Sequence, residues 1–185
     1  MVKFTLRCAI SIMVIVLTCA ACQKEKSQPP QTQTPAANID AKANPHAQPD
    51  GIPAPAWEAY KAARRAIAED NYIEARRQLM IAVQEKPDFT EAWYNLGATN
   101  GNLAIDEMAQ KHEQSAVLHF REAVDQKKRA QALIAEGKWF VYKTPAEQAM
   151  VQHDLTEALR DADEVLRDER SLITALKLMA AFRNQ

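Results

Sequence analysis

Four histidines are the side chains in this sequence that could most readily bind a metal or transfer a proton. His112 and His119 are seven residues apart, a spacing that places both on one face of a helix. Neither has carboxylate or cysteine neighbours at zinc-ligand spacing, and the two-histidine zinc protease motif is absent. His46 falls in a proline-rich stretch, and His153 has no partner in a motif. We interpret all four as surface histidines and predict no metal and no cofactor.

Carboxylates gather near the C-terminus, at Asp161, Asp163, Glu164, Asp168 and Glu169. Paired carboxylates can perform acid–base catalysis, but such a run along a helix is more typical of a solvated face. The sequence has no G-x-S-x-G nucleophile motif and no glycine-rich phosphate loop. We therefore predict that the protein is not an enzyme. An enzyme acting on the cell wall is the less favoured alternative.

The N-terminus has the pattern of an export signal. Lys3 and Arg7 make a cationic start, residues 8–18 are apolar, and the small residues Ala20 and Ala21 precede Cys22. The apolar stretch is shorter than the roughly 20 residues that a spanning helix needs. All three cysteines lie within the signal or directly after it, so we expect no disulfide in the mature domain.

This pattern resembles a bacterial lipoprotein signal, with residues 1–21 as the signal peptide. The resemblance implies that Cys22 is lipidated and becomes the first residue of the mature chain. Gln23 follows the cysteine, where retention at the inner membrane uses Asp, so the resemblance favours a lipid anchor in the outer membrane, facing the periplasm. The alternative is an ordinary signal peptide cleaved after Ala21, and either interpretation exports the chain.

Residues 22–55 differ in composition from the rest of the chain. Seven of the nine prolines fall between residues 23 and 55, with Ile39 and Ile52 as the only large apolar residues. Such a segment cannot bury enough apolar surface to offset the entropy of ordering. We interpret it as a disordered tether, and as a spacer from a membrane if Cys22 is lipidated. Loss of Lys3 and Arg7 changes the formal charge from −1 to −3, which excludes a strongly basic nucleic-acid-binding surface.

Residues 56–183 predict one all-α domain. Apolar residues recur at helical spacing, as in Tyr72, Leu79 and Val83. Four consecutive apolar residues, Trp139–Tyr142, are the only strand-like exception. They either fill the junction between two groups of helices or form an exposed patch that binds a partner.

The domain also contains a repeat signal. Residues 56–89 span 34 positions, and a small, small, large, small, proline pattern falls at Ala63, Ala75, Leu79, Ala82 and Pro87. The next block opens with Trp93, Leu96 and Gly97 and continues after a seven-residue insertion that extends its first helix. These residues resemble tetratricopeptide repeats, of which about two are present. The resemblance implies antiparallel helical hairpins stacked side by side.

Beyond the repeats the sequence predicts two closing helices. Gly137 suits a C-terminal cap, and Thr144–Glu147 combines a capping box with a proline at the first helical position. A last helix covers about Arg170–Phe182. The break near Asp168 has neither Gly nor Pro, so one longer helix is the alternative. We expect this pair to cover the exposed end of the stack.

Tetratricopeptide repeats bind partners on a concave face lined by their first helices. By position, the resemblance places seven residues there: Trp57, Tyr60, Arg64, Glu91, Tyr94, Ala98 and Asn102. The alternative role of the aromatic residues is packing within the stack. The resemblance implies a lipid-anchored adaptor that binds an unidentified envelope protein or peptide. The alternative from another class is a structural lipoprotein that associates with itself as a homo-oligomer.

Overall fold

The computed structural model describes residues 47–183. The signal peptide, Cys22 and most of the proline-rich stretch therefore lie outside the described residues. Within residues 47–183, no helix combines the length and the apolarity that crossing a membrane requires.

The described chain is all-α, as the sequence predicts, and no strand occurs between residues 47 and 183. The Trp139–Tyr142 segment belongs to the connection between two helices. The six helices are α2 (Ala54–Ala68), α3 (Tyr72–Glu85), α4 (Thr90–Ala109), α5 (Glu113–Ala135), α6 (Pro145–Val165) and α7 (Glu169–Arg183).

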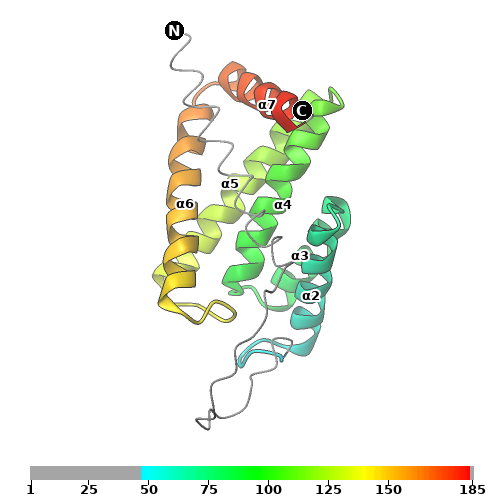
Figure 1. Cartoon of the computed structure of the whole chain (residues 1–185). Helices are drawn as coiled ribbons and strands as arrows, with labels where there is room; N and C mark the ends of the chain where they lie inside the picture. Colours follow the sequence, from blue (N-terminus) through cyan, green and yellow to red (C-terminus); the bar gives the residue numbers. More distant parts are fainter. Residues whose placement is uncertain (1–46, 184–185) are drawn as a thin grey trace, which may run out of the picture.

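The first four helices form two antiparallel hairpins that lie next to each other (Figure 1). Helix α2 packs against α3, α3 against α4, and α4 against α5. Helix α4 is 20 residues long and α2 is 15. Helix α4 also contacts α7, and nearly every residue of α4 is buried. It is the central helix of the domain.

Helices α4 and α5 approach each other closely at Gly97. A Cβ atom added there would lie 2.7 Å from Cγ of Lys127 and 3.0 Å from the carbonyl oxygen of Ala123. No side chain fits at that distance without movement of the neighbours. The same test at Gly101, one turn further along α4, finds nothing within 4 Å. Only the first of these two glycines is required by the helix crossing.

Helix ends follow local sequence signals. At the end of α5, Gly137 has a φ of 73°, its amide donates to Ile134, and the amide of Lys138 donates to Leu133. This is the Schellman motif that the glycine predicts. Thr144 and Glu147 form the predicted capping box, with Pro145 at the first helical position.

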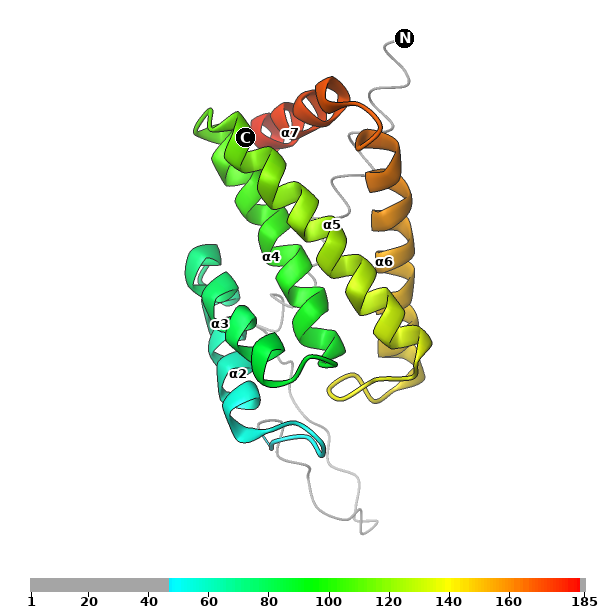
Figure 2. The same cartoon turned by 180° about the vertical axis from the view of Figure 1, so that it is seen from behind.

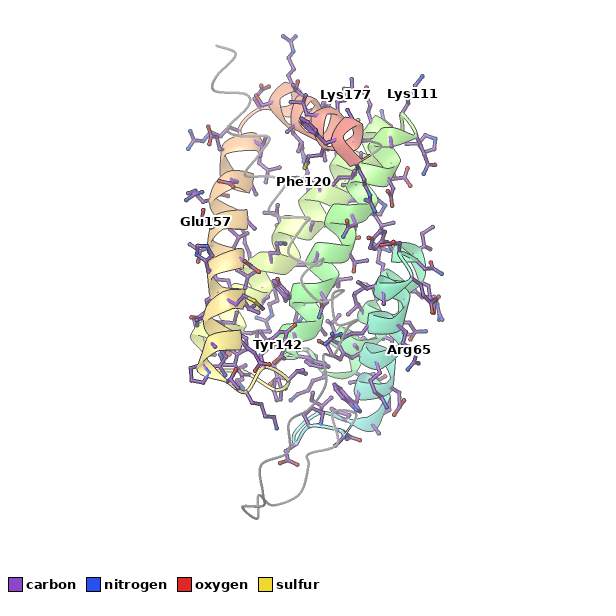
Figure 3. All side chains as sticks on the ribbon, viewed as in Figure 1. Arg65, Lys111, Phe120, Tyr142, Glu157 and Lys177 are labelled. Carbon is purple, nitrogen blue, oxygen red and sulfur yellow. The ribbon has the colours of Figure 1, made fainter. Side chains whose placement is uncertain are left out.

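The C-terminal residues form two helices. The side chain of Asp168 accepts hydrogen bonds from the amides of Arg170 and Ser171, so this aspartate caps α7 and separates it from α6. Figure 2 shows α6 running beside α5 while α7 crosses the end of the α4–α5 hairpin. Phe120 lies beneath α7 (Figure 3), in an apolar cluster that includes residues of α4, α6 and α7. The two helices therefore cover this hairpin from two directions.

Candidate functional site

The seven residues of the predicted partner-binding face come from α2 and α4. Trp57, Tyr60 and Arg64 lie on α2, and Glu91, Tyr94, Ala98 and Asn102 lie on α4. Six of the seven are buried, with at most 7% of each residue exposed, and Arg64 alone is exposed. The expectation of an open face formed by all seven therefore does not match their burial. The aromatic residues pack within the domain, which is the alternative that the sequence left open.

An aromatic series begins at Trp57 on α2. Its ring stacks on Tyr60 with centroids 5.6 Å apart, and Tyr60 lies 4.8 Å from Phe89, which directly precedes α4. Phe89 in turn meets the edge of Phe140 at 6.0 Å. The series thus runs from the first helix to the connection between α5 and α6. Phe89 was not among the predicted site residues, and Phe140 was considered only as part of the Trp139–Tyr142 segment.

The hydroxyl group of Tyr60 is buried and hydrogen-bonded. It accepts a hydrogen bond from Nδ2 of Asn95 at 3.0 Å, and that amide group also donates to the carbonyl oxygen of Glu91. Burial raises the pKa of Tyr60 well above its ordinary value. The neighbouring Tyr142 and Glu91 raise this pKa further, and Arg64 lowers it. Tyr60 is therefore held in its neutral form where α2 meets α4.

Glu91 binds the main chain of the connection between α5 and α6. Its Oε1 atom accepts three consecutive amide N–H groups, from Phe140 at 2.9 Å, Val141 at 2.7 Å and Tyr142 at 3.1 Å. Successive amides that converge on one oxygen form the kind of concavity that binds anions in proteins. The other carboxylate oxygen, Oε2, is buried with no hydrogen-bond partner. Glu91 is thus a main-chain-binding residue within its own chain.

Further side chains hold the same connection. The Thr90 hydroxyl donates to the carbonyl oxygen of Lys138, and Gln148 donates to the carbonyl oxygen of Tyr142 at 2.9 Å. Nζ of Lys138 lies 3.5 Å from Asp88, and Nζ of Lys86 lies 4.9 Å from the centre of the Phe140 ring. Main-chain groups of residues 138–142 are therefore bound by the side chains of Thr90, Glu91 and Gln148. The first two belong to the first turn of α4.

The Trp139–Tyr142 residues fill a junction between two clusters. Phe140 and Val141 pack against the cluster of α2, α3 and the start of α4. Trp139 and Tyr142 pack against Tyr94 and residues of α5 and α6. Figure 3 shows Tyr142 between the base of α6 and the helices beside it. The contacts of these four residues match the first interpretation, in which they fill the junction between two groups of helices.

Tyr94 packs against residues of α5 and α6 and so joins three helices. Its hydroxyl group donates to Oδ2 of Asp154 on α6 at 3.3 Å, and Nζ of Lys127 on α5 lies 5.8 Å from its ring. Burial raises the pKa of Asp154, while the Tyr94 hydrogen bond and the charges of Lys127 and His153 lower it. These contacts fix α6 against the central pair of helices.

Asn102 and Ala98 lie nearer the other end of α4. Nδ2 of Asn102 donates to the carbonyl oxygen of Ala98 at 3.2 Å. Arg183 of α7 forms an ion pair with Asp106 at 3.1 Å and lies over the ring of Tyr72 at 5.2 Å. The predicted residues therefore divide between the two ends of α4. Trp57, Tyr60 and Glu91 meet at the end near the connection, and Asn102 lies near the end of α7.

The histidines have no shared site. His112 pairs with Glu107 at 2.9 Å at the start of α5, His119 lies 3.6 Å from Glu122, and His153 is exposed on α6. His46 lies outside the described residues. Across residues 47–183, no three His, Cys, Asp or Glu side chains are grouped as metal ligands. No family model, curated protein or solved structure matches this chain.

Proposed function

We propose that this protein is a lipid-anchored adaptor of the bacterial cell envelope. In this proposal Cys22 carries the lipid in the outer membrane. The tether ends before Ile52, which is buried in the helical domain, because α2 begins at Ala54 and not after residue 55. The domain has two tetratricopeptide-like hairpins and binds a protein or peptide at the end of α2 and α4 where Arg64 is exposed, since the other six residues of the expected face are buried. The signal pattern and the composition of the tether support the first part, and the paired hairpins support the second.

The observation that carries the proposal is the binding of main chain by Glu91. Three amides of a non-helical segment converge on a side chain of α4, and aromatic side chains of α2 and its neighbours pack beside them. This end of α4 therefore has the chemistry needed to hold a peptide backbone and its apolar side chains. Arg64 is the exposed member of the seven, one turn from Tyr60, and its guanidinium group suits a carboxylate on a partner.

The experiment compares two neighbouring arginines of α2. Partners are captured by chemical crosslinking in intact cells from the full-length chain and from the variants Arg64→Glu and Arg65→Glu. Consecutive helical residues point in directions about 100° apart, so Arg65 faces away from Tyr60. We expect Arg64→Glu to abolish capture of a partner that Arg65→Glu retains, with circular dichroism unchanged in both. Equal capture by both variants would argue against this face.

Self-association is the second candidate function. Ile73 and Met80 are exposed by 77% and 45%, and their seven-residue spacing places them on one face of α3. Exposed apolar residues on one face mark protein interfaces more often than isolated ones do. Light scattering over a range of concentrations tests this candidate. A dimer in the wild-type protein that Ile73→Glu converts to a monomer would support it.

A further inference from the structure

The Lys138–Tyr142 segment is bound like a ligand by the start of α4. Its four apolar side chains remain partly exposed, while its main-chain groups take part in four hydrogen bonds to Thr90 and Glu91. A hydrophobic plug would hold mainly through buried side chains. Here main-chain hydrogen bonds hold the segment as well as side-chain packing does. Such hydrogen bonds depend little on which side chains the segment carries.

The binding residues are not saturated by this segment. An ionised carboxylate can accept about four hydrogen bonds, and all three from the segment reach Oε1 of Glu91. Oε2 is buried with no hydrogen-bond partner. A competing peptide that offers a further donor to Oε2 would satisfy the carboxylate more fully than the segment does. Leaving a buried polar atom unpaired is costly, so such a peptide has an advantage at this site.

We infer that the Lys138–Tyr142 segment is an autoinhibitory ligand that occupies the peptide-binding end of α4 within the same chain. This inference rests on the proposed function and names the regulation of that site. The partner it fits is a proline-free peptide with consecutive free amides and an aromatic side chain, because Glu91 needs the amides and Phe89 packs against the aromatic ring. Partner binding displaces the segment.

The covalent link sets the strength of the competition. A segment tethered by a short connection has an effective concentration of the order of millimolar. A free peptide of the same sequence must therefore compete poorly with the wild-type segment and bind well only when that segment is removed. This difference is measurable with the protein alone.

The main experiment uses the peptide of residues 137–143, GKWFVYK, with blocked ends. It is titrated by isothermal calorimetry into wild-type protein and into a variant whose residues 139–142 are replaced by Gly-Ser-Gly-Ser. That variant keeps Phe89, Thr90 and Glu91. We expect the variant to bind with a Kd of about 0.1–1 mM, and the wild type to bind at least about tenfold more weakly. No binding to a variant with unchanged helical circular dichroism would overturn the inference.

A matched peptide tests the main-chain recognition. N-methylation of Val141 in the peptide removes the donor of the 2.7 Å hydrogen bond and leaves its side chain intact. We expect this peptide to bind at least about tenfold more weakly than the unmodified one. Equal affinities for the two peptides would show that apolar contacts alone hold the segment and would overturn the inference.

A measurement on the wild-type protein decides the question if the replacement variant does not fold. Hydrogen exchange of the amides of residues 140–142 is followed with and without 10 mM peptide. Displacement of the segment exposes these amides to solvent. We therefore expect the unmodified peptide, but not the N-methylated one, to accelerate their exchange at least about fivefold. Unchanged exchange overturns the inference.

If the segment is displaced but crosslinking finds no partner, the adaptor function fails separately. If a partner is captured and the segment never moves, the adaptor function stands and the autoinhibition is wrong.

Discussion

Glu91 and Val141 are fifty residues apart in the sequence, and the amide of Val141 donates to Oε1 of Glu91 at 2.7 Å. This hydrogen bond connects the first turn of the central helix to the connection between α5 and α6. The amides of Phe140 and Tyr142 reach the same oxygen. Glu91 therefore fixes how the two helices beyond the connection are positioned against the first two hairpins.

The first prediction concerns the stability that Glu91 contributes. Glu91→Ala removes the acceptor of three partly buried amide hydrogen bonds and should lower the free energy of unfolding by about 3 kcal/mol. Glu91→Gln keeps one acceptor oxygen but loses the charge, and it should cost about 1–2 kcal/mol. Urea unfolding followed by circular dichroism measures both. Glu85→Gln, at an exposed position near the end of α3, is the control for the loss of a glutamate side-chain oxygen. If Glu91→Ala cost no more than this control, the three hydrogen bonds would contribute nothing.

The second prediction compares two glycines of α4. Gly97→Ala places a Cβ atom 2.7 Å from Cγ of Lys127 and should destabilise the domain by about 1–3 kcal/mol. Gly101→Ala meets no atom within 4 Å and should gain about 0.5–1 kcal/mol from its helix propensity. The two variants differ only in position, by one helical turn. Equal unfolding midpoints in urea would show that α4 and α5 do not cross at Gly97.

The third prediction concerns the end of α4. Lys111 has a φ of 66°, and the amide of His112 donates to the carbonyl oxygen of Glu107, so Lys111 occupies the left-handed position of a Schellman motif. Glycine adopts this conformation without strain. Lys111→Gly should therefore raise the free energy of unfolding by about 0.5–1 kcal/mol, while Gln131→Gly in the interior of α5 should lower it by about 1 kcal/mol. A loss of stability in Lys111→Gly would contradict this backbone geometry.

The fourth prediction is a dependence on alkaline pH. Burial holds the pKa of Tyr60 well above its ordinary value, so above pH ~10 the unfolded phenol loses its proton while the folded one keeps it. The contribution of Tyr60 to stability is therefore complete below pH ~10 and is lost above it, at about 1.4 kcal/mol per pH unit. Tyr60→Phe, which also loses the Asn95 hydrogen bond, should show a shallower decline above pH 10. If the stability of the two proteins declined in parallel, the pKa of Tyr60 would be the same in the folded and unfolded states.

The sequence predicted the elements that depend on local signals. The all-α class, the cap at Gly137 and the start of α6 at Thr144 are confirmed, because periodicity and capping residues act within one or two turns. The end of α6 was left open, although Asp168 is a capping residue for α7. The sequence lacks a glycine or proline there, but an aspartate side chain can begin a new helix by accepting hydrogen bonds from two amides of its first turn.

The candidate site was predicted less completely, because its contacts are distant in the sequence. Tyr60 and Glu91 were identified from their positions in a repeat, but their burial depends on Phe89, Asn95 and the segment around Phe140. No local pattern indicates that a connection fifty residues away returns to the first turn of α4. The resemblance placed Glu91 by position on a face for an external partner, whereas in the structure it binds this chain's own amides.

The proposed lipid anchor is Cys22, which lies outside the described residues. If the signal is that of a lipoprotein, Cys22→Ser should release the protein from the membrane fraction into the soluble fraction of the envelope, or leave its precursor uncleaved. Immunoblotting of fractionated cells distinguishes these outcomes from wild-type behaviour. Wild-type protein that is already soluble would favour an ordinary signal peptide cleaved after Ala21.

The central claim is that a partner binds the face of α2 and α4, and site-specific photocrosslinking tests it most directly. A photoreactive amino acid is placed at Arg64 in one full-length variant and at Arg65, which points away from the domain in Figure 3, in another. Both are irradiated in living cells. We predict a discrete adduct with an envelope protein from position 64 and none from position 65. The same adduct from both positions, or none from position 64, would contradict the claim.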